Sequence, residues 1–363
     1  MTLSPKPGVL DIQAYVGGRA AAPGATRVVK LSSNESPFGP SKAAIEAYRN
    51  IATDLAVYPE GSARILREGL AAHYGLDAAR IVCGNGSDEI LTMLANAYLR
   101  PRDEVLMSVY GFLVYKIAAL ANSATPVEVP EPGLRMDVDA MLAHVTGRTR
   151  MVYVANPNNP TGTYLTASEM RRLHAGLPAS VLLVIDAAYA EYVRKNDYET
   201  GVELVNEFDN VVMTRTFSKV YGLAGLRVGW AYCPAHVADT LNRVRGPFNV
   251  NIAAQRAALA ALQDVAHTEK SIAHNDIWRV WLTNEIRALK LDVTPSAANF
   301  VLIHFPDIAG RRASDADHFL MERGLILRGV GNYNLPGALR LTVGSEEDNR
   351  AVVDALRAFL ATS

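Results

Sequence analysis

The sequence predicts an α/β protein in which a mostly parallel, doubly wound sheet is followed by a smaller α+β domain. Between residues 80 and 233, short runs rich in β-branched and apolar residues alternate with stretches of helical periodicity. The runs lie at 80–83, 104–109, 151–155, 181–186, 211–214 and 226–233. Most gaps between them can hold the crossover helix that parallel strands need, so helices should cover both faces of the sheet.

The last of these runs is expected to be antiparallel to its neighbour. The segment between Thr214 and Leu226 is too short for a parallel crossover, and its glycines favour bends. Beyond residue 233 the pattern becomes that of an α+β domain. Expected there are a long helical stretch at 255–289, a strand at 299–304, a helix at 314–323, strands at 325–328 and 338–343, and a closing helix from Ser345.

These patterns divide the 363 residues into an N-terminal arm at 1–45, a large α/β domain at 46–250 and a small α+β domain at 251–363. The arm is rich in proline and glycine and must pack on the rest of the protein to be ordered. With 49% hydrophobic residues and a net charge of −1, the chain has an ordinary globular composition and no general attraction to nucleic acid or anionic membranes. Small-molecule partners are therefore expected.

The two cysteines, Cys83 and Cys233, each lie inside an apolar run, so neither a disulfide framework nor a metal site is expected. The first residues lack the apolar stretch of a signal peptide, and no apolar run is long enough to span a membrane. The sequence thus predicts a cytoplasmic protein.

A glycine-rich turn joins the first strand to a helix. In the run Cys-Gly-Asn-Gly-Ser-Asp-Glu at 83–89, glycines precede the helix and Ser87 is expected to cap it. Such a helix end exposes backbone N–H groups that bind phosphate well. The turn could equally be a simple strand-to-helix connection, and Asp88 and Glu89 could merely complement the helix dipole.

Two further strand ends carry polar side chains. Asp186 ends an apolar strand and Tyr189 follows three residues later, which places an acid and a phenol on one turn. An Asp at a strand end is often only a turn or capping residue. After the preceding strand comes Asn-Pro-Asn-Asn-Pro-Thr-Gly at 156–162, where turn chemistry explains the residue types but not their order.

Lys219 lies beside Thr216 and Ser218, and Arg227 follows in a glycine-rich bend. Most lysines are solvated surface residues. A lysine that follows an apolar strand and precedes a glycine-rich bend is more consistent with a buried amine nucleophile beside a phosphate site.

Four of these motifs together resemble the fold-type-I aminotransferases, which use pyridoxal 5'-phosphate (PLP), and most of all their histidinol-phosphate aminotransferase branch. They are the segments at 156–162, 186–189, 216–219 and 222–229. The likeness extends from the run at 31–40 to the run at 340–344, nearly the whole chain.

The resemblance implies a role for each candidate residue. Lys219 would bind the coenzyme covalently and carry a proton during the reaction, Asp186 would pair with the ring nitrogen, and Tyr189 would contact the ring oxygen. Asn159 would contact the same oxygen. Phe112 would stack on the ring, with Tyr110, two residues before it, as the alternative. The implied phosphate-binding groups are the backbone of Ser87 and Asp88 and the side chains of Thr216, Ser218 and Arg227.

The resemblance also implies a substrate site and a homodimer. Arg340 would receive the substrate anion, with Asn159 as a further substrate contact and Arg328 and Tyr15 as additional phosphate contacts. Tyr58 would reach the coenzyme phosphate of a neighbouring subunit, so that two chains share each active site. One position departs from the pattern: Asn334 stands where many relatives have glycine, although asparagine tolerates a positive φ.

The function expected first is transfer of an amino group from histidinol phosphate to 2-oxoglutarate in histidine biosynthesis. Aromatic amino acids are the second choice of donor, and decarboxylation of threonine phosphate is an alternative reaction. A PLP-binding regulator is disfavoured, because no basic helix-turn-helix segment precedes the domain and a mere binder would not need both Lys219 and Arg340.

Overall fold

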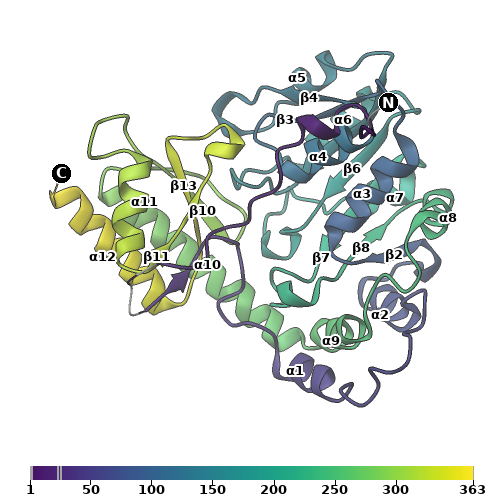
Figure 1. The fold of residues 1–363 in the computed structure, drawn as a ribbon, viewed down its shortest axis with the longest axis horizontal. Helices are drawn as coiled ribbons and strands as arrows, with labels where there is room; N and C mark the ends of the chain where they lie inside the picture. Colours follow the sequence, from purple (N-terminus) through teal and green to yellow (C-terminus); the bar gives the residue numbers. More distant parts are fainter. Residues whose placement is uncertain (1–2, 23, 25–26, 363) are drawn as a thin grey trace.

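The computed structural model describes residues 3–22, 24 and 27–362. In that part of the chain the large domain holds a seven-stranded sheet in the order β2-β8-β7-β6-β5-β3-β4 (Figure 1). The strands are β2 (Ile81–Gly84), β3 (Glu104–Ser108), β4 (Thr125–Val129), β5 (Thr149–Ala155), β6 (Leu182–Asp186), β7 (Val211–Thr216) and β8 (Gly229–Tyr232). The predicted α/β class with a mostly parallel sheet is confirmed.

The directions of the strands follow the predicted crossover lengths. Neighbours from β4 to β7 are parallel, whereas β8 is antiparallel to both β7 and β2, as the short connection before it predicts. Strand β4 was not predicted. Its sequence Thr-Pro-Val-Glu-Val is half exposed at the sheet edge, where proline and charged residues are tolerated but weaken a strand signal.

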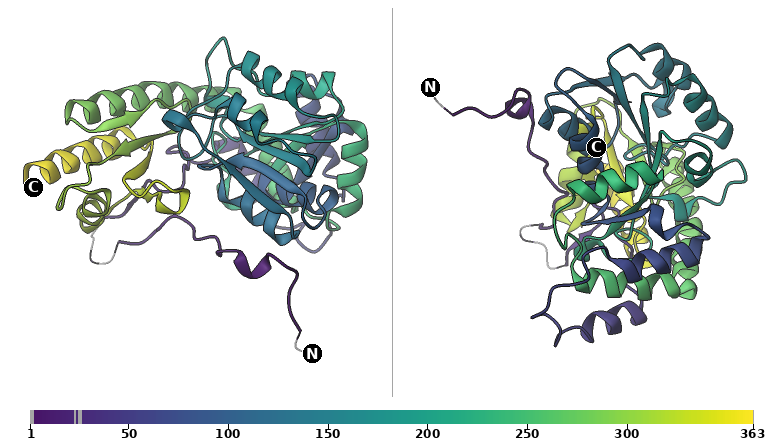
Figure 2. Two further views of the ribbon diagram at one scale, coloured as in Figure 1. Left: turned by 90° about the horizontal axis from the view of Figure 1, so that it is seen from above. Right: turned by 90° about the vertical axis from the view of Figure 1, so that its right-hand side faces the viewer.

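Helices cover both faces of this sheet (Figure 2). They are α2 (Arg64–Tyr74), α3 (Ser87–Tyr98), α4 (Leu113–Ala121), α5 (Val138–Ala143), α6 (Ala167–Gly176), α7 (Val202–Glu207) and α8 (Ala235–Val244). One apolar cluster packs α3, α4 and α8 on one face, and a larger cluster packs α2, α5, α6 and α7 on the other. Because both faces are covered, strands such as β6 are buried along their whole length.

The small domain is built on a four-stranded antiparallel sheet in the order β12-β13-β10-β9. Its strands are β9 (Asp292–Thr294), β10 (Phe300–His304), β12 (Arg328–Gly329) and β13 (Ala338–Thr342), with helices α10 (Val265–Ala288), α11 (Ala313–Glu322) and α12 (Glu346–Thr362). An apolar core of its own lies between this sheet and the three helices.

The helical stretch expected at 255–289 is two helices, α9 (Ile252–Gln263) and α10. They meet at Asp264, which leaves the helical conformation and accepts a hydrogen bond from the backbone N–H of His267, as an N-cap residue does. The buried alanines of α9 join the core under the large sheet, whereas Trp278 and Leu282 of α10 join the core of the small domain.

The N-terminal arm crosses between the two domains (Figure 1). Strand β1 (Val29–Lys30) pairs with β11 (Leu325–Ile326) of the small domain, and α1 (Lys42–Arg49) packs on α9. The residues between β1 and α1 are thereby held where the two domains meet. Short 3-10 helices η1 to η6 lie at Val9–Asp11, Ala78–Arg80, Pro132–Leu134, Ala190–Tyr192, Ala224–Leu226 and Gly331–Tyr333.

None of the helices in the described ranges combines the length and the apolar character that a membrane crossing requires.

Candidate active site

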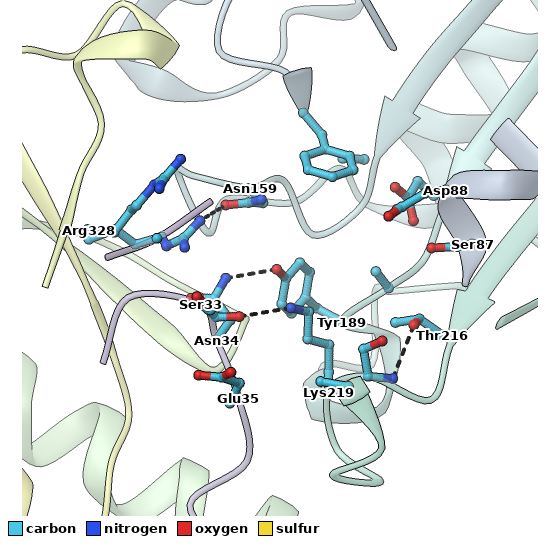
Figure 3. Close-up of a pocket in the computed structure, with 18 of the residues that line it drawn as sticks. Ser33, Asn34, Glu35, Ser87, Asp88, Asn159, Tyr189, Thr216, Lys219 and Arg328 are labelled. Atoms are coloured by element: carbon cyan, nitrogen blue, oxygen red, sulfur yellow. Dashed lines mark hydrogen bonds between the residues drawn. The ribbon is translucent and has the colours of Figure 1, made fainter. Parts of the chain in front are cut away.

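A pocket lies at the carboxyl ends of the large-domain strands, where the arm and the small domain meet them (Figure 3). This is the edge at which open α/β sheets bind their ligands. Of the residues predicted from the sequence, those that line the pocket are Tyr15, Ser87, Asp88, Phe112, Asn159, Asp186, Tyr189, Thr216, Ser218, Lys219, Arg227, Arg328 and Arg340. Segments that are far apart in the chain thus contribute to one cavity.

At one end of the pocket, helix α3 begins without a side-chain cap. Its N-cap residue is Gly86, with φ 84°, and Ser87 is the first helical residue, so the prediction that Ser87 caps the helix is wrong. The backbone N–H groups of the first turn therefore keep their capacity to bind an anion. A side chain at Gly86 would be strained by the positive φ, and its Cβ atom, 2.4 Å from a terminal nitrogen of Arg227, would displace that guanidinium from its position.

Polar side chains complete this end of the pocket. Arg227 donates to the Ser218 hydroxyl at 3.3 Å and to Asp88 at 3.2 Å, and it adopts a left-handed backbone conformation with φ 55°. The Thr216 hydroxyl accepts the backbone N–H of Ser218 at 3.1 Å. A helix N-terminus, two hydroxyls and a guanidinium around one space have the donor set that a phosphate group requires.

Asp186 ends β6 in a buried position. Tyr115 donates to Asp186 Oδ2 at 2.7 Å, and the Thr214 hydroxyl lies 3.4 Å from Oδ1. Burial raises the pKa of Asp186 to about 6, although the Tyr115 hydrogen bond opposes that shift. A cationic ring nitrogen beside this carboxyl would favour its ionised form.

Lys219 lines the same pocket and is partly buried. Its Nζ donates to the backbone carbonyl of Ser33 at 3.1 Å and lies 5.7 Å from the centre of the Tyr189 ring. Burial, together with the positive charge of Arg340, lowers the pKa of Lys219 to about 8. An amine with this pKa is far more often neutral near physiological pH than an exposed lysine is, as a nucleophile must be.

Arg340 lies on β13 and reaches the pocket from the small domain. It donates to Asn159 Oδ1 and, at 2.8 Å, to the carbonyl of Ser32. Its Nε is buried and has no partner among the described residues. Burial lowers the pKa of Arg340. An anionic ligand beside this guanidinium would satisfy the unpaired N–H and compensate for the buried charge.

Arg328 and two tyrosines lie near Arg340. Arg328 donates to the carbonyl of Val16 on the arm at 2.9 Å, and Tyr15 and Tyr333 line the same pocket. The ring of Phe112 is edge-on to that of Tyr15, with 6.4 Å between their centres, and Tyr110 does not line this pocket. The pocket therefore has a second cationic region, separate from the α3 end.

Tyr58 is the one predicted site residue that a single chain does not bring to the pocket. It is 80% exposed and stacks on Phe248, with 4.7 Å between ring centres. Its predicted role requires a second chain.

Three of the lining residues to which sequence reasoning assigned no role make contacts that matter for the site. Tyr115 binds Asp186, Asn34 donates to the Tyr189 hydroxyl at 2.8 Å, and Tyr333 lies beside the arginines. Tyr115 follows Phe112 at helical spacing, which is also the pattern of a core residue, and Asn34 lies on an arm whose position depends on tertiary contacts. Only the full fold identifies their partners.

The turn after Tyr333, where Asn334 stands in place of a glycine, adopts the positive φ that was predicted for it. Asn334 has φ 62°, in the left-handed region that asparagine tolerates. Its side chain also donates to the carbonyl of Val109 at 3.1 Å, which links this turn to the large domain.

Comparison with known proteins places these features in a family. The family model "Aminotransferase class I and II" matches residues 26–356. The chain is 58% identical to the histidinol-phosphate aminotransferase of Rhodopseudomonas palustris (strain HaA2) over 98% of both chains. It is 56% identical to the enzyme of the same name from Nitrobacter winogradskyi, again over 98% of both.

Solved structures share the fold. The fold matches the histidinol-phosphate aminotransferase from Sinorhizobium meliloti in complex with pyridoxal-5'-phosphate, with a TM-score of 0.89, 27% sequence identity and coverage of 98% of this chain and 97% of that one. The histidinol-phosphate aminotransferase from Clostridium acetobutylicum, 22% identical, has the same fold with a TM-score of 0.85, over 93% of this chain and 100% of that one.

Proposed function

The chain belongs to the class I and II aminotransferases, and on this premise we propose that it transfers the amino group of histidinol phosphate to 2-oxoglutarate, a reaction of histidine biosynthesis. It is a PLP-dependent aminotransferase of fold type I. The observation that carries the proposal is the convergence of Lys219, Asp186 and Arg340 on one pocket. The histidinol-phosphate relatives at 56–58% identity support the choice of substrate.

The residues of the pocket fit PLP. The uncapped start of α3, with Arg227 and the Ser218 hydroxyl, would hold the phosphate, and the buried Asp186 carboxyl would pair with the ring nitrogen. When bound, PLP supplies a protonated ring that withdraws electrons from the bond to the substrate's α-hydrogen. By holding the ring nitrogen protonated, Asp186 would keep this capacity at neutral pH.

Lys219 would act twice in the reaction. Its neutral amine would bind the coenzyme covalently, and after substrate has displaced it the freed Nζ would move the proton at the substrate's α-carbon. The lowered pKa of Lys219, about 8, suits both tasks, because the neutral amine is the nucleophile and the base. Tyr189 and Asn159 would contact the ring oxygen and Phe112 would stack on the ring.

The second cationic region would bind the substrate. Arg340, with its unpaired Nε, would receive a carboxylate of the keto acid or the anion of the amino donor. Arg328 and Tyr15 would contact the phosphate of histidinol phosphate, since both line the pocket beside Arg340. Binding at the small domain would orient the donor's amine toward Lys219, which lies on the large domain.

We also infer a cytoplasmic homodimer with shared sites. Tyr58 is exposed although it is a large aromatic residue, and it stacks on Phe248, also exposed. Burial of this pair against a second copy would bring the Tyr58 hydroxyl to the partner's phosphate site, as the family resemblance implies.

The test is a set of half-reactions. PLP-loaded protein is mixed separately with histidinol phosphate, phenylalanine, tyrosine and threonine phosphate, and the loss of the coenzyme's visible absorption is followed. We expect rapid loss with histidinol phosphate and recovery on addition of 2-oxoglutarate. Conversion by the aromatic amino acids without any by histidinol phosphate would refute the proposed donor. Release of carbon dioxide from threonine phosphate in place of a keto product would refute transamination.

A further inference from the structure

Asn34 is a buried residue of the arm to which the proposed function assigns no task. It is 1% exposed and adopts a left-handed backbone conformation with φ 57°. Asparagine tolerates this conformation, and hydrogen bonds to both backbone groups fix it. Here the backbone N–H donates to Thr342 Oγ1 at 3.0 Å, and the carbonyl accepts from Asn299 Nδ2 at 3.0 Å. The arm is thus fixed at this residue by the small domain.

The directions of the hydrogen bonds follow from the backbone N–H of Asn34, which can only donate. Thr342 Oγ1 accepts that N–H, so its own proton is available for Asn34 Oδ1 at 3.1 Å. With Oδ1 as the acceptor, the other end of the amide is Nδ2, a donor, and it lies 2.8 Å from the Tyr189 hydroxyl oxygen (Figure 3). The phenol oxygen must therefore accept, which leaves its proton for a different acceptor.

We propose that Asn34 is a positioning residue that keeps the Tyr189 hydroxyl as a hydrogen-bond donor toward the coenzyme, and that Thr342 orients Asn34 for this task. The inference rests on the proposed function, in which Tyr189 contacts the ring oxygen. A hydrogen bond accepted by a hydroxyl oxygen strengthens the bond that its proton donates. Asn34 therefore makes Tyr189 a better donor without touching the coenzyme itself.

The hydrogen bonds of Asn34 also link Tyr189 to the substrate site. Thr342 and Arg340 lie two residues apart on β13, so their side chains share one face of the small-domain sheet. Strand β13 therefore carries both Arg340 and Thr342, and Thr342 holds the Asn34 amide that orients Tyr189. Coenzyme chemistry on the large domain is thus linked to the small domain through the arm.

The pKa of Tyr189 agrees with this geometry. Burial raises this pKa, whereas the positive charge of Arg340 and the hydrogen bond from Asn34 lower it. Loss of Asn34 should make the phenol less acidic and a weaker donor.

The test uses PLP alone, without substrate, and measures the pH midpoint at which the absorption band of protein-bound coenzyme changes. A donor to the ring oxygen stabilises the more negatively charged, deprotonated form, so its weakening raises the midpoint. We expect Asn34→Ala to raise it by about 0.2 to 0.5 pH unit, a fraction of one hydrogen bond's contribution, because Asn34 strengthens the bond that Tyr189 donates and does not make it. In a Tyr189→Phe background the same change should add nothing, because the hydroxyl through which Asn34 acts is gone.

A second pair of variants keeps the test decisive if Asn34→Ala does not fold. Thr342→Val removes the hydroxyl that orients Asn34 and should raise the midpoint, whereas Thr342→Ser retains the hydroxyl and should keep the wild-type value. Equal shifts with and without the Tyr189 hydroxyl, or wild-type midpoints in both Asn34→Ala and Thr342→Val, would overturn the inference alone. A wild-type protein that binds no PLP would overturn the proposed function and the inference together.

Discussion

The coenzyme half and the substrate half of the pocket are built differently. Asp186, Thr216 and Lys219 come from the ends of neighbouring strands of one sheet or from the loop that follows, so the sheet itself sets their spacing. Arg340 lies on a different sheet, and Tyr15 lies on the arm. The large sheet alone sets most of the first half, although Lys219 and Tyr189 also contact the arm. The second half exists only while the arm, the large domain and the small domain are assembled. Substitutions should therefore affect the two halves in different ways.

The largest effect is expected in the coenzyme half. Lys219→Ala should lower kcat by about four orders of magnitude or more, because covalent binding and proton transfer are both lost. The variant should still bind PLP without a covalent bond, since the phosphate site and Asp186 remain. Stopped-flow half-reactions and equilibrium dialysis measure the two properties. Lys195→Ala is a matched control at an exposed position and should behave like the wild type. Turnover by Lys219→Ala near the wild-type rate would contradict the role of Lys219 in covalent binding and proton transfer.

In the substrate half, Arg340→Ala should raise KM for both substrates and lower kcat/KM by about 100-fold. The reason is that a buried, charge-assisted contact contributes about 2–5 kcal/mol. The dissociation constant of PLP should change little, because Arg340 is not part of the phosphate cradle. Steady-state kinetics and a PLP titration separate these quantities. Unchanged kinetics would refute the anion-binding role, and a large loss of PLP affinity would show that the two halves are not separable.

The pH dependence of coenzyme loading above pH 7 reports on Lys219, because Asp186, with a pKa of about 6, is already ionised there. Because burial and Arg340 lower its pKa to about 8, the neutral amine becomes about tenfold more abundant with each unit that the pH rises toward that value, and then saturates. The rate of covalent PLP binding to the apoprotein should rise with pH and level off above about 8. A small free alkylamine, whose pKa is not lowered, should continue to gain rate to about 10.4. Levelling of the protein's rate only near that higher value would contradict a buried, perturbed lysine.

The smallest effect is expected at Tyr58. Tyr58→Phe should weaken PLP binding by about three- to tenfold, the loss of one hydrogen bond to phosphate. Tyr48→Phe, at another exposed tyrosine, is the control. PLP titrations of the two variants provide the comparison.

Mixed dimers then show which chain supplies Tyr58. When a Tyr58→Phe chain pairs with a Lys219→Ala chain, the site that retains Lys219 faces an intact Tyr58 from its partner and should bind PLP with wild-type affinity. Weak binding at that site would show that Tyr58 does not act across the interface.

The same contrast explains how much could be predicted from the sequence. Asp186 ends one apolar strand and Lys219 follows another, so the pattern of strands and turns predicts that both lie at the same edge of the sheet, and the family resemblance supplies their roles. The antiparallel direction of β8 followed from one short connection. The roles of Asn34 and Tyr115 did not follow, because each depends on a partner, Tyr189 or Asp186, that is distant in the chain.

The boundaries of individual helices and strands were harder still to predict. Capping of α3 by Ser87 was predicted, but the helix begins one residue earlier than that assignment implies and Gly86 takes the cap position. The interruption at Asp264 was missed, since the helical periodicity on its two sides looks continuous. Edge strand β4 has too mixed a sequence to be recognised. These are the places where tertiary packing, and not local preference, decides the structure.

The most direct test of the account is to locate the lysine that holds the coenzyme. Borohydride fixes the bond between PLP and a lysine, and a modified lysine is no longer cut by trypsin. The account predicts that the label appears on residues 216–227, recovered as one peptide that is uncut after Lys219. Label on any other lysine, or no label after PLP has been bound, would contradict it.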